Sequence, residues 1–194
     1  MAMHTEPSLM AAEALAAEER AQETAFNGSR DIVRKTKHAI HGIHIGRRDA
    51  ELIDSISSDL ARLIEALMPF PKVVYGPHVE AAMAEFAETV IYDRALLGEE
   101  IPSFVDLDVT PAAWVMGLAD AVGELRRDML GRLMDDDTDG AYAIFSVMET
   151  LSDSLMDFDV KDSVVPLRRK QDVCRGIMEK SRGEMAAARV MRRQ

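Results

Sequence analysis

The chain has 194 residues, 47% of them apolar and 5% aromatic, and its formal net charge at pH 7 is −11. This length and composition fit one globular domain over residues 1–194, and the single cysteine, Cys174, excludes an intramolecular disulfide or a cysteine zinc site. No apolar run approaches the roughly 18 residues of a membrane span, and residues 1–10 lack the features of a signal peptide, so we expect a soluble cytoplasmic protein without membrane contact.

The commonest residues, Ala, Leu, Met, Glu and Arg, lose little conformational freedom in a helix, and they predict an all-α fold. The first helical pattern covers 6–26 and resumes over 30–45, after an interruption at Asn27-Gly28-Ser29. Either one long bent helix or two stacked helices fits this pattern. The next helix is expected over 50–67, where apolar residues repeat on one face until two prolines end it.

A third long helical pattern begins near Pro77, continues to about residue 97 and ends at Gly98. Residues 99–109 form a linker that contains one proline. Thr110 followed by Pro111 then predicts a helix start, because Thr is a good N-cap and Pro is favoured at the first helical position. We expect this fourth helix to end near residue 134.

Two further helices are expected, over 141–156 and from Pro166 to about residue 192. Six or seven helices with short connections predict an antiparallel bundle. The acidic turn 135–140 has acids at positions one, three and five of a calcium loop and Gly at six, but the twelfth position is Ser146. Without the closing Glu, we interpret it as a solvated turn between helices.

Two pairs of acidic residues lie inside apolar helical patterns, where uncompensated charge is expensive to bury. Glu85 and Glu88 form the first pair, and Asp120 and Glu124 form the second. Spacings of three and four place each pair on one helix face, so two packed helices could aim four carboxylates at one point, as a hard cation requires. The competing interpretation is a solvated face on which the acids pair with Lys or Arg. Small residues around the second pair, which permit close helix approach, weaken that interpretation.

His38, His41 and His44 recur every three residues, so the first two share a helix face and the third lies off it. We favour a structural or phosphate-contacting role over metal ligation, because the spacing provides no further ligands. Tyr92 and Trp114 lie in apolar patterns and are expected in the core rather than as platforms for base stacking.

Three segments resemble the translin superfamily, and together they span nearly the whole chain. Residues 116–127 match the superfamily's signature helix, with its pattern G-x-A-D-x-x-G-E-L-x-R. Residues 29–44 are similar to its first helix, and residues 167–184 are similar to its closing helix. The resemblance implies a bundle of about seven helices and assembly into octameric barrels, with the active sites and the RNA on the inner surface.

The resemblance also implies which branch of the superfamily the chain is closer to. Translin itself mainly binds single-stranded nucleic acid, whereas translin-associated factor X and its archaeal relatives carry a catalytic E-x-x-E together with the Asp and Glu of the signature helix. Glu85 and Glu88 match the first motif, and Asp120 and Glu124 match the second. The short linker 99–109 makes the chain more like the compact archaeal homo-oligomers than like the eukaryotic factor.

We therefore expect a Mg²⁺- or Mn²⁺-dependent endoribonuclease that cleaves single-stranded RNA inside a homo-oligomer, an octamer by resemblance. The four acids would be both the metal ligands and the catalytic residues, because carboxylate oxygens suit these ions. Lys37 and Arg127 match RNA contacts of the family and would neutralise phosphates. The net negative charge does not oppose this, since the basic residues are clustered. The alternative is a non-catalytic protein that binds single-stranded RNA or DNA.

Overall fold

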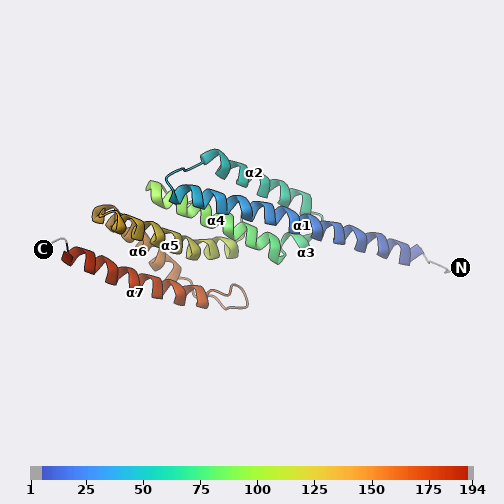
Figure 1. Cartoon of the computed structure of the whole chain (residues 1–194). Helices are drawn as coiled ribbons and strands as arrows, with labels where there is room; N and C mark the ends of the chain where they lie inside the picture. The colour runs from blue at the N-terminus through green and yellow to red at the C-terminus, as the bar shows by residue number, and fades with distance from the viewer. Residues whose placement is uncertain (1–5, 192–194) are drawn as a thin grey trace.

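The computed structural model describes residues 6–191, which contain seven helices and no strand (Figure 1). The all-α prediction is confirmed for this part of the chain, whereas the predicted end of the last helix near residue 192 lies outside it. The helices are α1 (Glu6–His44), α2 (Ala50–Leu67), α3 (Pro71–Val74), α4 (Pro77–Leu97), α5 (Pro111–Met134), α6 (Thr138–Met156) and α7 (Arg168–Met191).

Helix α1 continues without a break through Asn27-Gly28-Ser29, so the single long helix is the correct alternative. Glycine inside a helix costs up to about 1 kcal/mol relative to alanine. Its use at this position follows from packing, because a Cβ on Gly28 would lie 2.7 Å from Cδ1 of Leu63 in α2. The apparent helix breaker thus lets α2 pack closely against α1.

Local capping sets most of the other helix ends. Asp49 accepts a hydrogen bond from the backbone N–H of Leu52 at the start of α2, and Thr110 accepts one from Ala113 at the start of α5. Gly98 ends α4 in the left-handed conformation, with φ of 67°.

Two boundaries differ from the sequence prediction, and one helix was missed. Helix α6 begins three residues earlier than expected, at Thr138, because Asp137 accepts a hydrogen bond from the N–H of Gly140 and caps it. Helix α7 begins at Arg168, two residues after Pro166. The single turn α3 is too short to leave a periodic signal.

The helices pack side by side around a core that is centred on α4 and α5. Helix α4 contacts α1, α2 and α5, and α5 contacts α6 and α7 in turn (Figure 1). The N-terminal part of α1 extends beyond the other helices. Both α4 and α5 bury side chains on several faces, including Phe86 and Ile91 of α4 and Leu125 and Met129 of α5.

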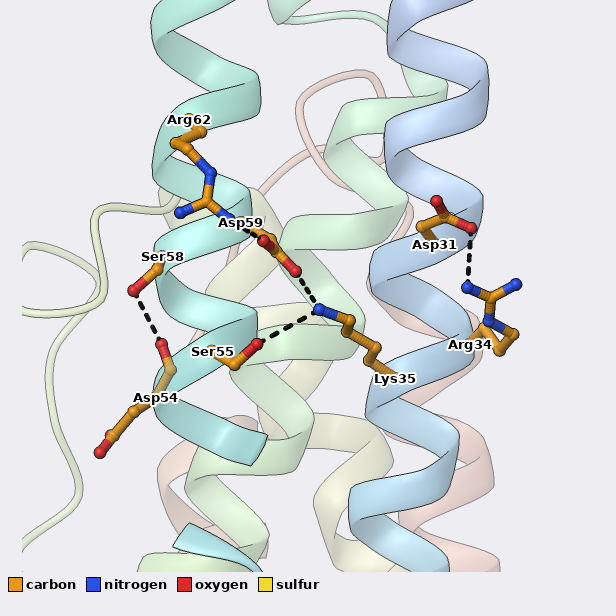
Figure 2. Close-up of polar contacts among 8 residues, drawn as sticks. All are labelled: Asp31, Arg34, Lys35, Asp54, Ser55, Ser58, Asp59 and Arg62. Carbon is orange, nitrogen blue, oxygen red and sulfur yellow. Dashed lines mark hydrogen bonds and ion pairs between the residues drawn. The ribbon is translucent and has the colours of Figure 1, made fainter. Parts of the chain in front are cut away.

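Polar contacts fix α1 against α2 on one side of the bundle. Figure 2 shows Lys35 reaching from α1 toward α2, where it donates to Asp59 and, over 3.2 Å, to the hydroxyl of Ser55. Arg34 points to the side of α1 away from α2 and pairs with Asp31 at 3.1 Å.

No helix within residues 6–191 is long and apolar enough to cross a membrane.

Candidate functional site

Close packing of α5 on α4 brings the two acidic pairs to the same region of the bundle. A Cβ on Gly117 would lie 2.6 Å from the backbone nitrogen of Glu88 and 2.7 Å from the carbonyl oxygen of Ala84. Glycine at this position therefore allows the backbones of the two helices to approach each other directly beside Glu88. Asp120 lies one turn further along α5 from Gly117, so it follows this point of contact.

The carboxyl of Glu88 shows how strongly the four acids interact. Its pKa is raised to about 8, first by burial and then by surrounding negative charge. That charge comes, in decreasing order of effect, from Asp120, Glu85 and Glu124, whereas the ammonium of Lys170 opposes it. The structure thus places Glu88 within electrostatic range of the other three predicted acids.

Glu85, Glu88, Asp120 and Glu124 are called the acidic cluster below, and Glu85 is the member that contacts α1. Burial raises the pKa of its carboxyl, against the opposing effects of Lys37 and of a hydrogen bond from Thr36. The hydroxyl of Thr36 donates to Oε2 of Glu85 over 3.4 Å. Lys37, which the sequence analysis assigned to phosphate binding, is exposed on α1 and its charge reaches the acidic cluster.

Asp120 is paired with Lys170, which comes from α7. The ammonium donates to both carboxylate oxygens, at 2.6 Å for Oδ2. Lys170 is not among the predicted site residues. It lies in the segment that resembles the superfamily's closing helix, but nothing in its spacing indicates which helix it contacts.

Glu124 is held by His44, the last residue of α1. Nε2 of His44 lies 2.5 Å from Oε2 of Glu124, and Nδ1 lies 3.2 Å from Oδ1 of Asp128. The hydroxyl of Tyr92 donates to Asp128 and lies 3.0 Å from Nδ1 of His44. Burial, followed by the hydrogen bond to Asp128, raises the pKa of Tyr92, so the phenol stays protonated and acts as a donor.

These contacts are structural, which is one of the two roles predicted for the histidines of this segment, but the contact of His44 with Glu124 was not predicted. The side chain of His44 is only 5% exposed. His38 and His41 are exposed on α1. Tyr92 is fully buried, as predicted, and Trp114 is partly buried, with its indole N–H donating to the carbonyl oxygen of Pro102 over 2.9 Å.

The two arginines that follow the acidic pair of α5 differ in their surroundings. Arg126 is tied to α7, where it donates to Glu184 at 2.7 and 2.8 Å and to Ser181 at 2.8 Å. Arg127 is exposed and lines an open pocket together with His44. Its exposure fits the predicted phosphate contact, and the ion pair of Arg126 fits a role in packing.

The donor set suits a hard cation, because it consists of carboxylates from α4 and α5. No group of three or more His, Cys, Asp or Glu side chains within residues 6–191 is gathered closely enough to hold a metal ion. Lys170 and His44 instead pair with Asp120 and Glu124, and Thr36 donates to Glu85. An ion would replace these partners, and the predicted ligand set stays a prediction.

No protein-family model matches the chain. The chain is 33% identical over 174 residues to an uncharacterized protein of Methanocaldococcus jannaschii, and the match covers 88% of this chain and 78% of the archaeal protein.

Three solved structures share the fold of the chain. The crystal structure of AfC3PO matches with a TM-score of 0.87 and 33% identity, covering 95% of this chain and 98% of AfC3PO. A complex of AfC3PO with duplex RNA matches with a TM-score of 0.80 and 31% identity, covering 94% of this chain and 96% of the AfC3PO chain. Apo-NeC3PO matches with a TM-score of 0.81 and 18% identity, covering 97% of this chain and 100% of NeC3PO. At this identity the match shows a similar fold and nothing more. Because the C3PO proteins are of the translin and factor X type and the identity to AfC3PO extends over almost the full length of both chains, the chain belongs to the translin superfamily.

Proposed function

We propose that this chain is a Mg²⁺- or Mn²⁺-dependent endoribonuclease that cleaves single-stranded RNA. The observation that carries the proposal is that α4 and α5 bring Glu85, Glu88, Asp120 and Glu124 to one partly buried region, where burial and then the charges of the other three acids raise the pKa of Glu88. Buried negative charge of this kind destabilises a fold. A bound divalent cation would offset it.

Glu85, Glu88, Asp120 and Glu124 would hold the ion. When bound, it would lower the pKa of an attacking water and offset the charge that develops on the scissile phosphate. The basic residues of the chain have complementary roles. Lys37 and Arg127, both exposed near the acidic cluster, would neutralise the phosphates on either side of the scissile bond. Lys170, when Asp120 binds the ion, would become free to contact the RNA backbone.

RNA as the ligand is supported by the similarity to AfC3PO, a protein whose structure in complex with duplex RNA is known. Because that complex contains duplex RNA, cleavage of single-stranded RNA and of duplex RNA by this chain should be compared. We propose that the single strand is the form that this chain cleaves, as the resemblance to the catalytic branch implies.

A homo-oligomer, by resemblance an octameric barrel, would enclose the acidic cluster. The part of α1 that extends beyond the bundle supports such an assembly (Figure 1), because it exposes apolar side chains that water does not favour. Leu9, Met10 and Leu15 are 50%, 66% and 67% exposed. Light scattering coupled to size-exclusion chromatography should give a multiple of the 21.5 kDa protomer mass, and a monomer would contradict the assembly.

The catalytic proposal is tested by cleavage of an end-labelled single-stranded RNA in Mn²⁺. Glu85→Gln should lower the rate at least about 100-fold, as expected when a ligand of a catalytic metal is lost. Glu149→Gln is the matched control, because Glu149 is an acid on α6 that pairs only with Arg182 among the contacts described. Wild-type cleavage by the Glu85 variant would show that the assignment is wrong.

A second candidate function, a non-catalytic RNA- or DNA-binding protein, is favoured by one observation. Lys170, His44 and Thr36 already give three of the four acids a partner within the protein. EDTA separates the two candidates. Cleavage that EDTA abolishes, with binding retained, supports the enzyme, whereas tight binding without any metal-dependent cleavage supports the binding protein.

A further inference from the structure

A pocket of about 840 Å³ lies between the middle of α1 and the first turn of α4, outside the acidic cluster. Its basic wall comes from α1, where Arg30, Arg34 and Lys37 line it. Spacings of four and three residues place these side chains on one face of the helix. Lys37 is also the cation whose charge reaches Glu85, so one residue of this basic wall lies within electrostatic range of the acidic cluster.

Two aromatic rings occupy the far end of this pocket. The centroids of Phe26 and His78 are 5.2 Å apart, with an edge-to-face angle of 77°. The guanidinium carbon of Arg30 lies 5.4 Å from the centroid of the Phe26 ring. Phe26 is nevertheless 42% exposed. Exposed rings and guanidinium planes are the groups on which unpaired bases stack.

One residue of the pocket lining, Ser29, carries a buried hydroxyl without a partner. Ser29 lines the pocket and is only 4% exposed. Its Oγ is the one buried side-chain nitrogen or oxygen atom within residues 6–191 that has no hydrogen-bond partner. Such an atom destabilises the folded chain until a partner arrives.

Other helical hydroxyls of the chain avoid this penalty by donating to the backbone four residues earlier. Thr89 donates to the carbonyl oxygen of Glu85 over 2.8 Å, and Ser181 donates to that of Ile177 over 2.9 Å. Ser29 has the same option in α1 but does not make the bond. Because its Oγ is buried, a sugar, base or phosphate oxygen in the pocket would reach it only after a small shift of the neighbouring side chains.

The basic side chains of the pocket are also available for a ligand. Arg34 pairs with Asp31 at 3.1 Å, but both side chains are more than 60% exposed, and surface pairs of this kind contribute little to stability. Figure 2 shows this pair on the side of α1 that faces away from α2. An RNA phosphate could compete with Asp31 for the guanidinium at small cost.

We infer that this pocket binds one nucleotide of the RNA strand whose scissile phosphate lies at the acidic cluster, an inference that rests on the RNA binding proposed above. The base would stack beside Phe26 and His78, and the phosphate would contact Arg30 and Arg34. Eleven residues of helix separate Phe26 from Lys37, which is about 16 Å along α1. The pocket therefore holds the strand several nucleotides from the cleavage position and selects for an unpaired base there.

The test measures binding of single-stranded RNA oligonucleotides in EDTA, each with 2-aminopurine at a different position. Phe26→Ala and Arg30→Gln should each weaken binding about tenfold, the effect of losing one stacked base. Tyr142→Ala and Arg62→Gln remove an exposed ring and an exposed arginine elsewhere, and they should bind as the wild type does. In the wild type, 2-aminopurine emission should change on binding at one region of the strand, and Phe26→Ala should remove that change.

Ser29→Ala separates ligand binding from a purely structural role. Loss of an unpartnered buried hydroxyl should raise the melting temperature, and the same variant should weaken RNA binding. Unchanged RNA affinity in Ser29→Ala, Phe26→Ala and Arg30→Gln, each folded by circular dichroism, would overturn the pocket. If a free nucleoside monophosphate displaced the labelled oligonucleotide as well as an unlabelled oligonucleotide does at the same concentration, the pocket would bind single nucleotides and not a nucleotide within a strand.

The outcomes for the pocket and for the proposed function are distinguishable. If the wild type binds and cleaves RNA, and the Ser29, Phe26 and Arg30 variants bind it as tightly as the wild type, the pocket inference alone is wrong. If the wild type does not bind RNA, the proposed function fails first, and the pocket inference fails with it.

Discussion

Lys170 of α7 donates to both carboxylate oxygens of Asp120 in α5. The pair joins residues of two helices that are 50 positions apart in the sequence, and it places an ammonium group at the edge of the acidic cluster. The ammonium of Lys170 thus lies beside one of the four carboxylates that we propose as metal ligands, where it would compete with a bound metal ion. The first prediction follows from this competition.

Lys170→Met should increase the affinity for Mn²⁺ several-fold, because the variant removes both a competing partner of Asp120 and a repelling charge. Isothermal titration calorimetry measures the change. Lys35→Met is the matched control, since Lys35 forms a similar ion pair with Asp59 between α1 and α2. Equal Mn²⁺ affinity of the Lys170 variant and the wild type would argue against Asp120 as a ligand.

Glu88 should make the stability of the metal-free protein fall as the pH rises. Its pKa is about 8 in the folded state and 4.5 for the ordinary side chain, so the folded protein binds the extra proton between these values. The stabilising contribution is complete below pH 4.5 and is lost as the pH rises through 8. Glu88→Gln, which stays neutral, should therefore unfold at a higher temperature than the wild type above pH 8, and the difference should vanish near pH 4.5.

Thermal unfolding in EDTA across this pH range measures the effect, with Glu149→Gln as the control on an exposed helix face. A Glu88 variant whose melting temperature follows that of the wild type at every pH would contradict the buried, charge-crowded environment of this carboxyl. Adding Mn²⁺ should raise the melting temperature of the wild type above pH 8 more than that of Glu88→Gln, since the ion stabilises the ionised carboxylate.

His44→Ala should destabilise the protein by about 1–3 kcal/mol, because Glu124 and Asp128 each lose a hydrogen-bond partner whose side chain is only 5% exposed. Urea denaturation at neutral pH gives the free energy of unfolding. His41→Ala, one turn earlier on the exposed face of α1, should change it by less than about 0.5 kcal/mol. The contacts described for His44 would be of no structural importance if both variants were equally stable.

Gly117→Ala should separate α4 from α5 and lower the affinity for Mn²⁺. The new Cβ would lie 2.6 Å from the backbone nitrogen of Glu88, and a backbone clash of this kind costs about 1–3 kcal/mol. In the same helix, Gly131→Ala meets nothing within 4 Å and should be neutral or stabilising. Calorimetry and urea denaturation of the two variants test whether the close approach at Gly117 positions the acidic residues.

Local signals were sufficient to predict three of the long helices. The ends of α2, α4 and α5 coincide with the predicted ends, because capping residues such as Thr110 and Gly98 act within a few residues of themselves. The start of α6 was predicted too late, since Asp137 was assigned to the turn rather than to the cap. Gly28 interrupts the helical pattern but not the helix, because its role depends on Leu63 in another element.

The candidate site shows the same division between local and distant information. Helical spacing predicted that Glu85 and Glu88 share a face. The meeting of this pair with the acids of α5 depends on packing at Gly117, which the small residues of that segment only indicated. Lys170 and His44 reach the cluster from 50 and 80 residues away in the sequence, and no periodic pattern encodes such contacts.

Crystals of the protein soaked with Mn²⁺ give the most direct test of a cation held by the acids of α4 and α5. We predict an anomalous peak about 2 Å from carboxylate oxygens of Glu85, Glu88, Asp120 and Glu124, with Lys170 displaced from Asp120. An anomalous map without a peak among these four side chains, in crystals that bind Mn²⁺ elsewhere, would contradict the metal-dependent mechanism.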